Sequence, residues 1–416
     1  MSPIRRGDGV TILPTGLAEV RKGDGTKIWP AAKAGGTAVY AQTGATSDKQ
    51  SVMPTSGPTS APSIQWSVPV SDQGATSNGS PVMTRVTDTS IYVMTYTNNR
   101  RLYAIDREKG ELLWTVDLGT DVLMKMVYYE PEEYVICDNN GALTAIDKYG
   151  KAAWTTTEES LGWQVDLTLG DDGYVYALSG NMFKLDPTDG SIVWSVNQTT
   201  PARLSSIPLT GDESGIFDGR NDGALSRLDT SDGSGVFTEF SGTVGDSRMV
   251  WAGNGYVYLV GEHGDNDYGW NVVQMDAGNG TQGWTHQFNT QDYNYPETQP
   301  LITPNYVVIQ LGGVDCTVYA HDKGSGGVQW SSSASNQMHD LPMDQNNNIY
   351  CNGGGTYDVK AINESDGSVV WSTSVDNGLG WAVGQVIPDN GEVIVTQQAA
   401  ENPFGPDERA YVKLLA

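Results

Sequence analysis

A short pattern recurs along most of the chain: an apolar strand, an Asp or Asn, a Gly, and then an aromatic residue on a second strand. In six copies the Gly lies four residues and the aromatic residue eight residues after the Asp or Asn; these copies begin at Asp106, Asp186, Asp229, Asp276, Asp322 and Asn363. A seventh copy, from Asp147 to Trp154, is one residue shorter. The Asx side chain can accept a hydrogen bond from backbone two residues on, and Gly supplies the positive-φ position of a tight turn. Each copy therefore predicts a hairpin.

A further strand pair precedes each hairpin, as in DDGYVYAL (171–178) and NGEVIV (390–395). The unit is thus about four short strands in roughly 40 to 48 residues, which is typical of a propeller blade. IQWSVPV (64–70) has the aromatic strand without its partner, and AYVKLLA (410–416) has the partner without the aromatic strand. Pairing the two completes one more blade. We predict an all-β, eight-bladed β-propeller closed by its N- and C-terminal strands.

The motif resembles the A-x-D-x-x-T-G-x-x-x-W repeat of the PQQ-like (quinoprotein-type) propeller superfamily, from about residue 64 to the end of the chain. The resemblance implies a structural role for the motif aromatics, which can wedge between neighbouring sheets. These residues are Trp66, Trp114, Trp154, Trp194, Phe237, Trp284, Trp330 and Trp371.

The enzymes of this superfamily hold PQQ at the ring axis, and those similar to methanol dehydrogenase add a vicinal disulfide and a calcium ion. Here Cys137, Cys316 and Cys351 are far apart, which favours buried thiols over disulfides. No HExxH, CxxC or GxSxG motif occurs. We therefore expect no enzyme activity, no catalytic residues, no PQQ and no dedicated metal site, although the loops leave room for a bound cation.

The first 63 residues lack the repeat. Residues 1–40 predict an anchoring arm with a hairpin around Gly23-Asp24-Gly25. Residues 41–63 are rich in Ser, Thr, Pro and Gly, which predicts an extended linker before the propeller at 64–416. Arg5 and Arg6 are followed by Gly-Asp-Gly and not by an apolar stretch, so we expect no export signal here.

The chain has 24 basic and 50 acidic residues, a formal net charge of −26 and a sequence pI of about 4.3. This charge repels nucleic acid and anionic membranes, so neither is expected as a partner. The acidic residues are spread through the repeats and do not form one block. In this respect the chain resembles proteins of salt-loving archaea and their viruses.

The longest departures from the repeat lie in one predicted blade, in GEHGDNDYGW (261–270) and QFNTQDYNYPE (287–297). Aromatic faces and carboxylates suit the binding of sugars, directly or through a cation. The candidate receptor patch comprises Asp265, Asp267, Tyr268, Trp270, Asp292, Tyr293 and Tyr295. The alternative is ordinary loop decoration. Asp344, Asn346 and Asn348 resemble half of a calcium loop, but a strand-joining turn explains them better because Ile349 replaces the required Gly.

The sequence leaves two functions open. The first is a virion surface or tail protein of a halophilic archaeal virus, with its arm bound to other virion proteins in an oligomeric assembly and its propeller displayed to a host glycan or S-layer. The alternative is a cellular PQQ-like binding or scaffold protein of a haloarchaeon, located in the cytoplasm or outside the cell, and akin to the outer-membrane assembly scaffold lipoprotein. Fold alone does not decide between them.

Overall fold

The computed structural model describes residues 4–5, 11–12, 20–21, 27–28, 53, 55–70, 80–96, 100–119, 125–139, 142–156, 166–179, 181–197, 209, 214–219, 224–240, 247–251, 255–262, 269–289, 300–311, 316–334, 341–352, 358–375, 380–400 and 408–416. The chain forms two compact units, Met1–Ala38 and Val39–Ala416. No helix in these ranges is long and apolar enough to span a membrane.

The first unit contains two strand pairs. The first pair is β1 (Ile4–Arg5) with β2 (Thr11–Ile12), and the second is β3 (Val20–Arg21) with β4 (Lys27–Ile28). In the second pair Val20 lies opposite Ile28, so the pairing is centred on the predicted Gly23-Asp24-Gly25 turn.

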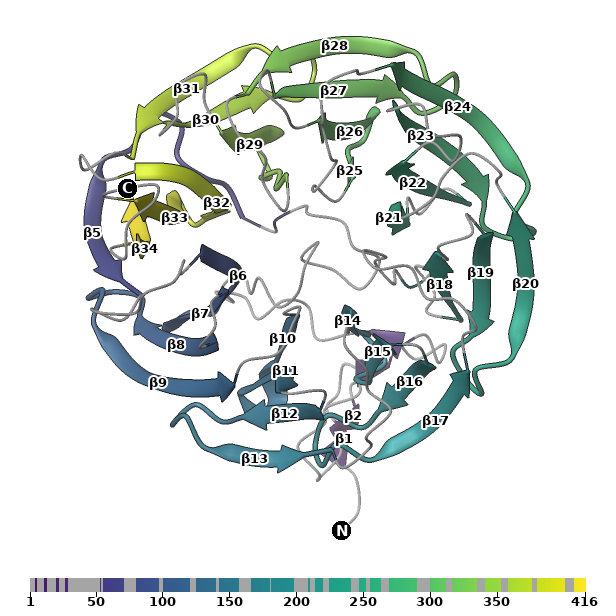
Figure 1. Cartoon of the computed structure of the whole chain (residues 1–416), viewed down its shortest axis with the longest axis horizontal. Helices are drawn as coiled ribbons and strands as arrows, with labels where there is room; N and C mark the ends of the chain where they lie inside the picture. Colours follow the sequence, from purple (N-terminus) through teal and green to yellow (C-terminus); the bar gives the residue numbers. More distant parts are fainter. Residues whose placement is uncertain are drawn as a thin grey trace. The chain divides into compact units, whose positions relative to one another are not determined.

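The second unit is a ring of eight sheets, each with three or four strands (Figure 1), which confirms the predicted eight-bladed propeller. Blade 1 comprises β6 (Ser80–Val86), β7 (Ser90–Tyr96), β8 (Arg100–Asp106) and β9 (Leu112–Gly119). Blade 2 comprises β10 (Met126–Tyr129), β11 (Tyr134–Asn139), β12 (Ala142–Ile146) and β13 (Ala152–Thr155), with a short 3-10 helix, η1 (Glu130–Glu132), after β10. Blade 3 comprises β14 (Asp166–Leu169), β15 (Val175–Ser179), β16 (Asn181–Leu185) and β17 (Ile192–Asn197).

Blade 4 comprises β18 (Gly215–Gly219), β19 (Ala224–Asp229) and β20 (Gly235–Phe240), with Leu209 bridged to Ile216 at its inner edge. Blade 5 comprises β21 (Ser247–Trp251), β22 (Tyr256–Glu262), β23 (Gly269–Asp276) and β24 (Gln282–Asn289). Blade 6 comprises β25 (Leu301–Ile302), β26 (Tyr306–Leu311), β27 (Thr317–Asp322) and β28 (Val328–Ser333). Blade 7 comprises β29 (Asn348–Asn352), β30 (Asp358–Asn363) and β31 (Val369–Ser374), with Met343 bridged to Ile349.

Blade 8 contains both ends of the repeat region: β32 (Gly380–Asp389), β33 (Glu392–Ala400), β34 (Glu408–Leu415) and β5 (Ile64–Pro69). Antiparallel pairing sets Leu414 opposite Trp66 and Val412 opposite Val68. The predicted clasp between 64–70 and 410–416 is therefore confirmed, and it closes the ring without a covalent link between the two strands.

The hydrophobic core is distributed between neighbouring blades. Tyr92 of blade 1 stacks on Tyr128 of blade 2, with ring centroids 5.5 Å apart, inside a cluster that draws on both sheets. Similar clusters join blades 2 and 3, 3 and 4, 4 and 5, and 5 and 6, and the largest runs through blades 6, 7 and 8. Because each blade buries its apolar faces against the next, no blade is a separate folding core.

The register between third and fourth strands shifts just before the motif aromatic. In blade 1, Ala104 pairs with Trp114 and Ile105 with Leu112, so Leu113 is an extra, bulged residue. The register shifts at the matching place in the other seven blades, including the one formed by the chain termini. A bulge re-aims the side chain that follows it, and here it directs the aromatic residue toward the next blade.

The linker predicted at 41–63 is described only for Met53 and residues 55–63, and this part is bound to the propeller. These residues, which we call the strap, contact blades 7 and 8. Met53 donates its N–H to the Met343 oxygen at 2.7 Å, and Ser56 accepts from Gly391 N–H at 2.7 Å. Composition predicted an extended linker because Ser, Thr, Pro and Gly are common in linkers, and the same residues suit an extended segment whose backbone is bound by a neighbouring surface.

Candidate functional site

The motif tryptophans lock each blade to the next. The indole Nε1–H of Trp114 donates to the Lys148 oxygen at 2.7 Å, where Lys148 directly follows the Asx residue of the next blade. The same bond recurs from Trp66, Trp154, Trp194, Trp284 and Trp330, with distances from 2.8 to 3.1 Å to Arg107, Pro187, Thr230, Lys323 and Glu364. Each of these six indoles thus donates a hydrogen bond across an interface between two blades.

The turn glycine belongs to the same contact. Gly367 has φ of 70°, and a Cβ placed on it would lie 2.9 Å from Cδ2 of Trp330 in the preceding blade. Any side chain there would meet both a positive φ and a rigid indole ring. The Asx-Gly spacing therefore specifies the interface between blades as well as the turn.

Blade 4 carries Phe237, which has no N–H to donate. Arg227, on the neighbouring strand of the same blade and paired with Phe237, donates from Nη1 to the Ala277 oxygen at 3.2 Å. Ala277 follows Asp276 and is the matching acceptor in blade 5. A guanidinium thus replaces the indole at this interface, a substitution that the aromatic pattern alone did not reveal.

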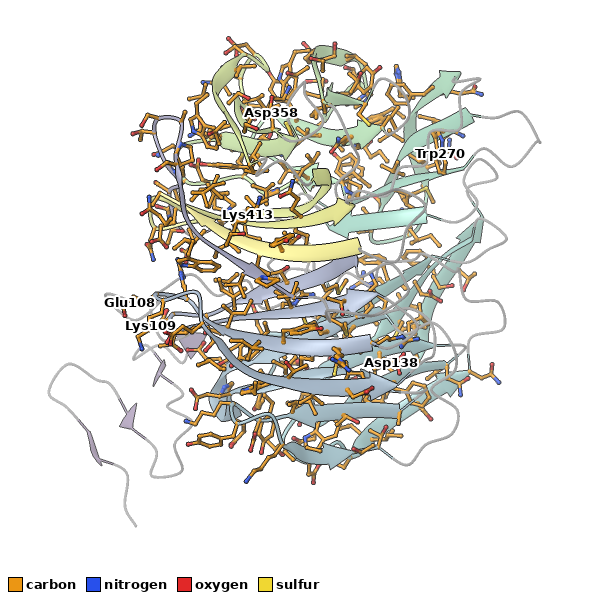
Figure 2. The ribbon with its side chains drawn as sticks, turned by 60° about the vertical axis from the view of Figure 1, so that its left-hand side comes forward. Glu108, Lys109, Asp138, Trp270, Asp358 and Lys413 are labelled. Atoms are coloured by element: carbon orange, nitrogen blue, oxygen red, sulfur yellow. The ribbon has the colours of Figure 1, made fainter. Side chains whose placement is uncertain are left out.

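Trp270, the tryptophan of the candidate receptor patch, is buried and is not part of a surface patch. Trp270 lies at the start of β23, opposite Phe288, and only 8% of its surface is exposed. It packs in the cluster between blades 5 and 6, so it cannot stack on a sugar as expected. Figure 2 shows Trp270 at the opposite end of the propeller from the Glu108 and Lys109 turn. The other patch residues, Asp265, Asp267, Tyr268, Asp292, Tyr293 and Tyr295, lie outside the described residues.

The Asp344 carboxylate is occupied by protein donors. Its Oδ1 accepts from the N–H groups of Asn346 and Asn348 at 2.9 Å each. Its Oδ2 accepts from the Tyr350 hydroxyl and from Gly57 N–H, also at 2.9 Å. Asp344 is fully buried, and this set of donors describes a strand-joining turn.

Exposed aliphatic side chains recur where the outermost strands begin. On the four successive blades 6, 7, 8 and 1 they are Val328, Val369, Val370, Ile64, Leu112 and Leu113; Val193 of blade 3 and Val236 of blade 4 are also exposed, but blade 2 separates them from this run. We call this set the aliphatic band; its exposed fractions run from 37% for Ile64 to 55% for Val369. β28, β31, β5 and β9 follow one another on the circumference in Figure 1. Neighbouring pairs such as Leu112 with Leu113 and Val369 with Val370 expose apolar surface that an interaction partner can cover.

Carboxylates border this surface at the hairpin turns. Hydrogen bonds from Ser325 lower the pKa of Asp322 in blade 6, and hydrogen bonds from Ser368 lower the pKa of Asp366 in blade 7. The lowered pKa values keep both carboxylates charged at neutral pH, which gives the turns a negative character.

A family model described as outer membrane protein assembly factor BamB matches residues 16–215, 179–316 and 314–403, which together span most of the chain. The chain belongs to this BamB-type PQQ-repeat family. No curated protein sequence matches it.

Several solved propellers share the BamB-type fold. Quinohemoprotein alcohol dehydrogenase ADHIIG from Pseudomonas putida HK5 aligns with a TM-score of 0.65 at 14% identity, over 90% of this chain and 80% of that one. The quinohemoprotein alcohol dehydrogenase from Comamonas testosteroni gives 0.66 at 11% identity, with the same coverage. BamB from Moraxella catarrhalis gives 0.56 at 15% identity, over 85% of this chain and 97% of that one. At such identities the likeness shows the fold alone.

The three cysteines of this BamB-type chain are free and buried, as the sequence predicts. Burial raises the pKa of both Cys137 and Cys351 to about 12, so neither thiol is a nucleophile at neutral pH. His321 is also buried, in a residue position that the other six motif copies fill with Ile, Leu or Met. Its Nδ1 lies 3.0 Å from the Gly326 oxygen, and its Nε2 has no partner among the described residues.

Proposed function

We propose that this propeller is a non-enzymatic scaffold that binds partner proteins at the aliphatic band. The observation that carries the proposal is the exposure of six aliphatic side chains on the outer strands of four successive blades. The inter-blade hydrogen bonds hold these strands in a fixed ring. The backbone under the band therefore does not have to be ordered when a partner binds, and that entropy cost of binding is avoided. Binding sites that rest on a rigid framework are favoured in this way.

The partner's chemistry follows from the surface around the band. Apolar side chains suit an apolar patch on a protein, and the charged turns at Asp322 and Asp366 favour basic residues at its margin. The net charge of −26 argues against nucleic acid and anionic lipid as partners. The proposal includes no PQQ and no metal cofactor, because the vicinal cysteine pair expected of methanol dehydrogenase-like enzymes is missing from the sequence.

A narrower hypothesis makes this scaffold a virion surface or tail protein of a halophilic archaeal virus, joined to the particle by residues 1–40. It rests on the dispersed acidity of the chain. The family and the solved relatives named above are assembly factors and enzymes, which lend support to the scaffold but none to the virion. Capsid and tail genes beside the coding gene would favour the virion, and secretion or transport genes would favour a cellular scaffold.

Site-specific photo-crosslinking in the producing cells tests the band. A photoreactive residue at Leu113 or Val370 should capture the same partner protein from two different blades. Thr115 and Ser372 are matched controls, because each is exposed on the same strand two residues further along. Captures should be several-fold weaker at these controls. Equal yields at all four positions would refute the band as the binding surface.

An activity assay tests the non-enzymatic part separately. Protein loaded with PQQ and calcium should oxidise alcohols or glucose no faster than a protein-free control in a dye-linked assay. Oxidation above that control would contradict the scaffold proposal, whatever the crosslinking shows.

A further inference from the structure

The eighth blade lacks the turn that its neighbours use. In blades 1 to 7 a hairpin turn joins the third and fourth strands, and the residue after its Asx accepts a hydrogen bond from the preceding blade. In blade 8 the third strand ends at the C-terminus and the fourth begins at Ile64, so no such turn joins them. The strap supplies the missing acceptor, since Trp371 Nε1–H donates to the Pro58 oxygen at 2.9 Å.

Both flanking blades bind the strap backbone. From blade 7, Gln345 N–H donates to the Thr55 oxygen at 3.1 Å, and the Asp344 carboxylate accepts from Gly57 N–H at 2.9 Å. From blade 8, Gly391 N–H donates to the Ser56 oxygen at 2.7 Å. Further along, Thr373 Oγ1 of blade 7 donates to the Pro62 oxygen at 2.9 Å. Main-chain groups of consecutive residues are thus recognised alternately from two sides, as in peptide-binding grooves.

Three side-chain positions make this recognition sequence-specific. Met53 is only 1% exposed. The Thr55 hydroxyl donates to Asp389 Oδ1 at 2.8 Å. A Cβ on Gly57 would overlap the Tyr350 hydroxyl and lie 3.0 Å from Cβ of Pro388. The groove therefore selects a Met, a Thr two residues later, and a Gly two residues after the Thr.

The groups that hold the strap are themselves fixed by the propeller. Asp344 is held by Asn346, Asn348 and Tyr350, none of which belongs to the strap. Asp389 Oδ2 accepts from Arg107 Nη1 of blade 1 at 2.5 Å. A groove whose donors and acceptors are already positioned binds an extended segment with little reorganisation, and a Pro-containing segment loses little entropy on binding.

We propose that the groove between blades 7 and 8 is a peptide-binding site whose built-in ligand is the strap, and that it also binds an extended Met-x-Thr-Ser-Gly-Pro segment offered by a separate peptide. The tethered strap competes for the groove at high effective concentration, so the site is open to an outside peptide only when the strap is removed or weakened. The groove and the aliphatic band involve different residues, so an experiment can refute the proposal for one of them and leave the proposal for the other standing.

The test uses the full chain with residues 53–62 replaced by the same number of alternating Gly and Ser. A synthetic peptide of residues 51–62 should bind this variant saturably and raise its melting temperature, while the unaltered protein should not bind it. The same peptide with Gly57→Ala should bind at least about tenfold more weakly because its Cβ overlaps Tyr350. Equal binding of the two peptides, or no binding of either, would overturn the proposal.

A second variant covers the case in which the strap-replaced chain does not fold. Gly57→Ala in the full chain keeps every other strap residue. It weakens strap binding only at the contact between residue 57 and Tyr350. This variant should bind the unaltered peptide, and peptide binding should restore slow hydrogen exchange at Gln345 and Gly391, whose N–H groups donate to the strap. If Gln345 and Gly391 of the folded variant exchange faster than in the unaltered protein and the variant still binds no peptide, the groove is not a peptide site. If they exchange no faster, the fit of Gly57 against Tyr350 does not hold the strap, and the proposed sequence specificity is wrong.

Discussion

Arg227 Nη1 and the Ala277 oxygen, 3.2 Å apart, form the inter-blade hydrogen bond that seven indoles form elsewhere in the ring. Ala277 is almost fully buried, so its carbonyl would lose a partner if Arg227 were removed. The guanidinium also donates from Nη2 to Ser214 Oγ at 3.2 Å and lies over the Phe217 ring, with Cζ 6.0 Å from the ring centroid. Blade 4 therefore binds blade 5 through a side chain that lies outside the repeated motif.

The Arg227→Met variant should lower the free energy of unfolding by about 1–2 kcal/mol, since Met keeps the aliphatic packing but leaves the Ala277 oxygen without its donor. Adding Phe237→Trp should recover most of that loss, because an indole at this position can supply the donor found in the other blades. Phe237→Trp alone should gain little, as Arg227 already bonds the oxygen. Urea unfolding of the three variants checks this, and a double variant no more stable than Arg227→Met would contradict it.

The terminal clasp should contribute far more stability than the N-terminal unit. Deleting residues 410–416 removes most of β34 and leaves β33 and β5 with unpaired edges. Deleting residues 1–38 leaves the strap and the clasp in place. We expect the first deletion to lower the melting temperature by many degrees or to prevent folding, and the second to change it little. Similar melting temperatures for both would show that the clasp is not needed for closure.

The propeller was predictable from the sequence because each blade repeats the same local chemistry. An Asx, a Gly and an aromatic residue at fixed spacing together specify the hairpin turn, the bulge and the side chain that packs between neighbouring blades. Blade 8, which is formed by both ends of the repeat region, could therefore be recognised from IQWSVPV and AYVKLLA. The strap could not be found in this way. It takes the place of a hairpin turn without sharing its residues, because Pro58 offers the same backbone oxygen from a different chain path.

Departures from the repeat carried the remaining information. Two such departures were in the sequence but were not used: Phe237 has no N–H to donate, and His321 places a polar group where the other motif copies have an aliphatic residue or Met. The patch prediction overlooked strand geometry: Trp270 was treated as part of a loop, but β23 begins at Gly269 and turns the indole into the core. Loop composition alone does not say where a strand begins.

Salt dependence tests the inference drawn from the acidity. Turn carboxylates such as Asp189 and Asp229 have lowered pKa values because Ser191 and Ser231 donate hydrogen bonds to them, so they stay charged at neutral pH. Their repulsion reaches about 10 Å in 0.1 M salt and about 3 Å in 1 M salt. The melting temperature should therefore rise between these two salt concentrations, while sucrose at equal osmolality should not reproduce the rise fully. A melting temperature independent of salt would remove the argument for a halophilic source.

His321 should make the propeller sensitive to mild acid. Burial lowers the pKa of His321 from 6.5 to about 4, and the neighbouring His286, with ring centroids 4.8 Å apart, adds repulsion to its charged form. Below pH 6.5 the unfolded chain binds a proton that the folded chain does not, so stability falls as the pH drops from about 6.5 toward 4. A difference of about 2.5 pKa units corresponds to a loss of roughly 3 kcal/mol once the pH is below 4.

The His321→Leu variant should remove this part of the acid sensitivity, because Leu occupies the matching position in blades 3 and 4, at Leu185 and Leu228. Ile362→Leu is the matched control in blade 7: it changes a buried aliphatic at the same position and should leave the pH dependence unaltered. Melting temperatures of all three proteins between pH 7 and 4.5 measure the effect in a range where most carboxyls remain charged. If His321→Leu loses as much stability as the unaltered protein over that range, the acid sensitivity lies elsewhere. If it loses less, and the control does not, the charge on one imidazole between blades 5 and 6 accounts for the difference.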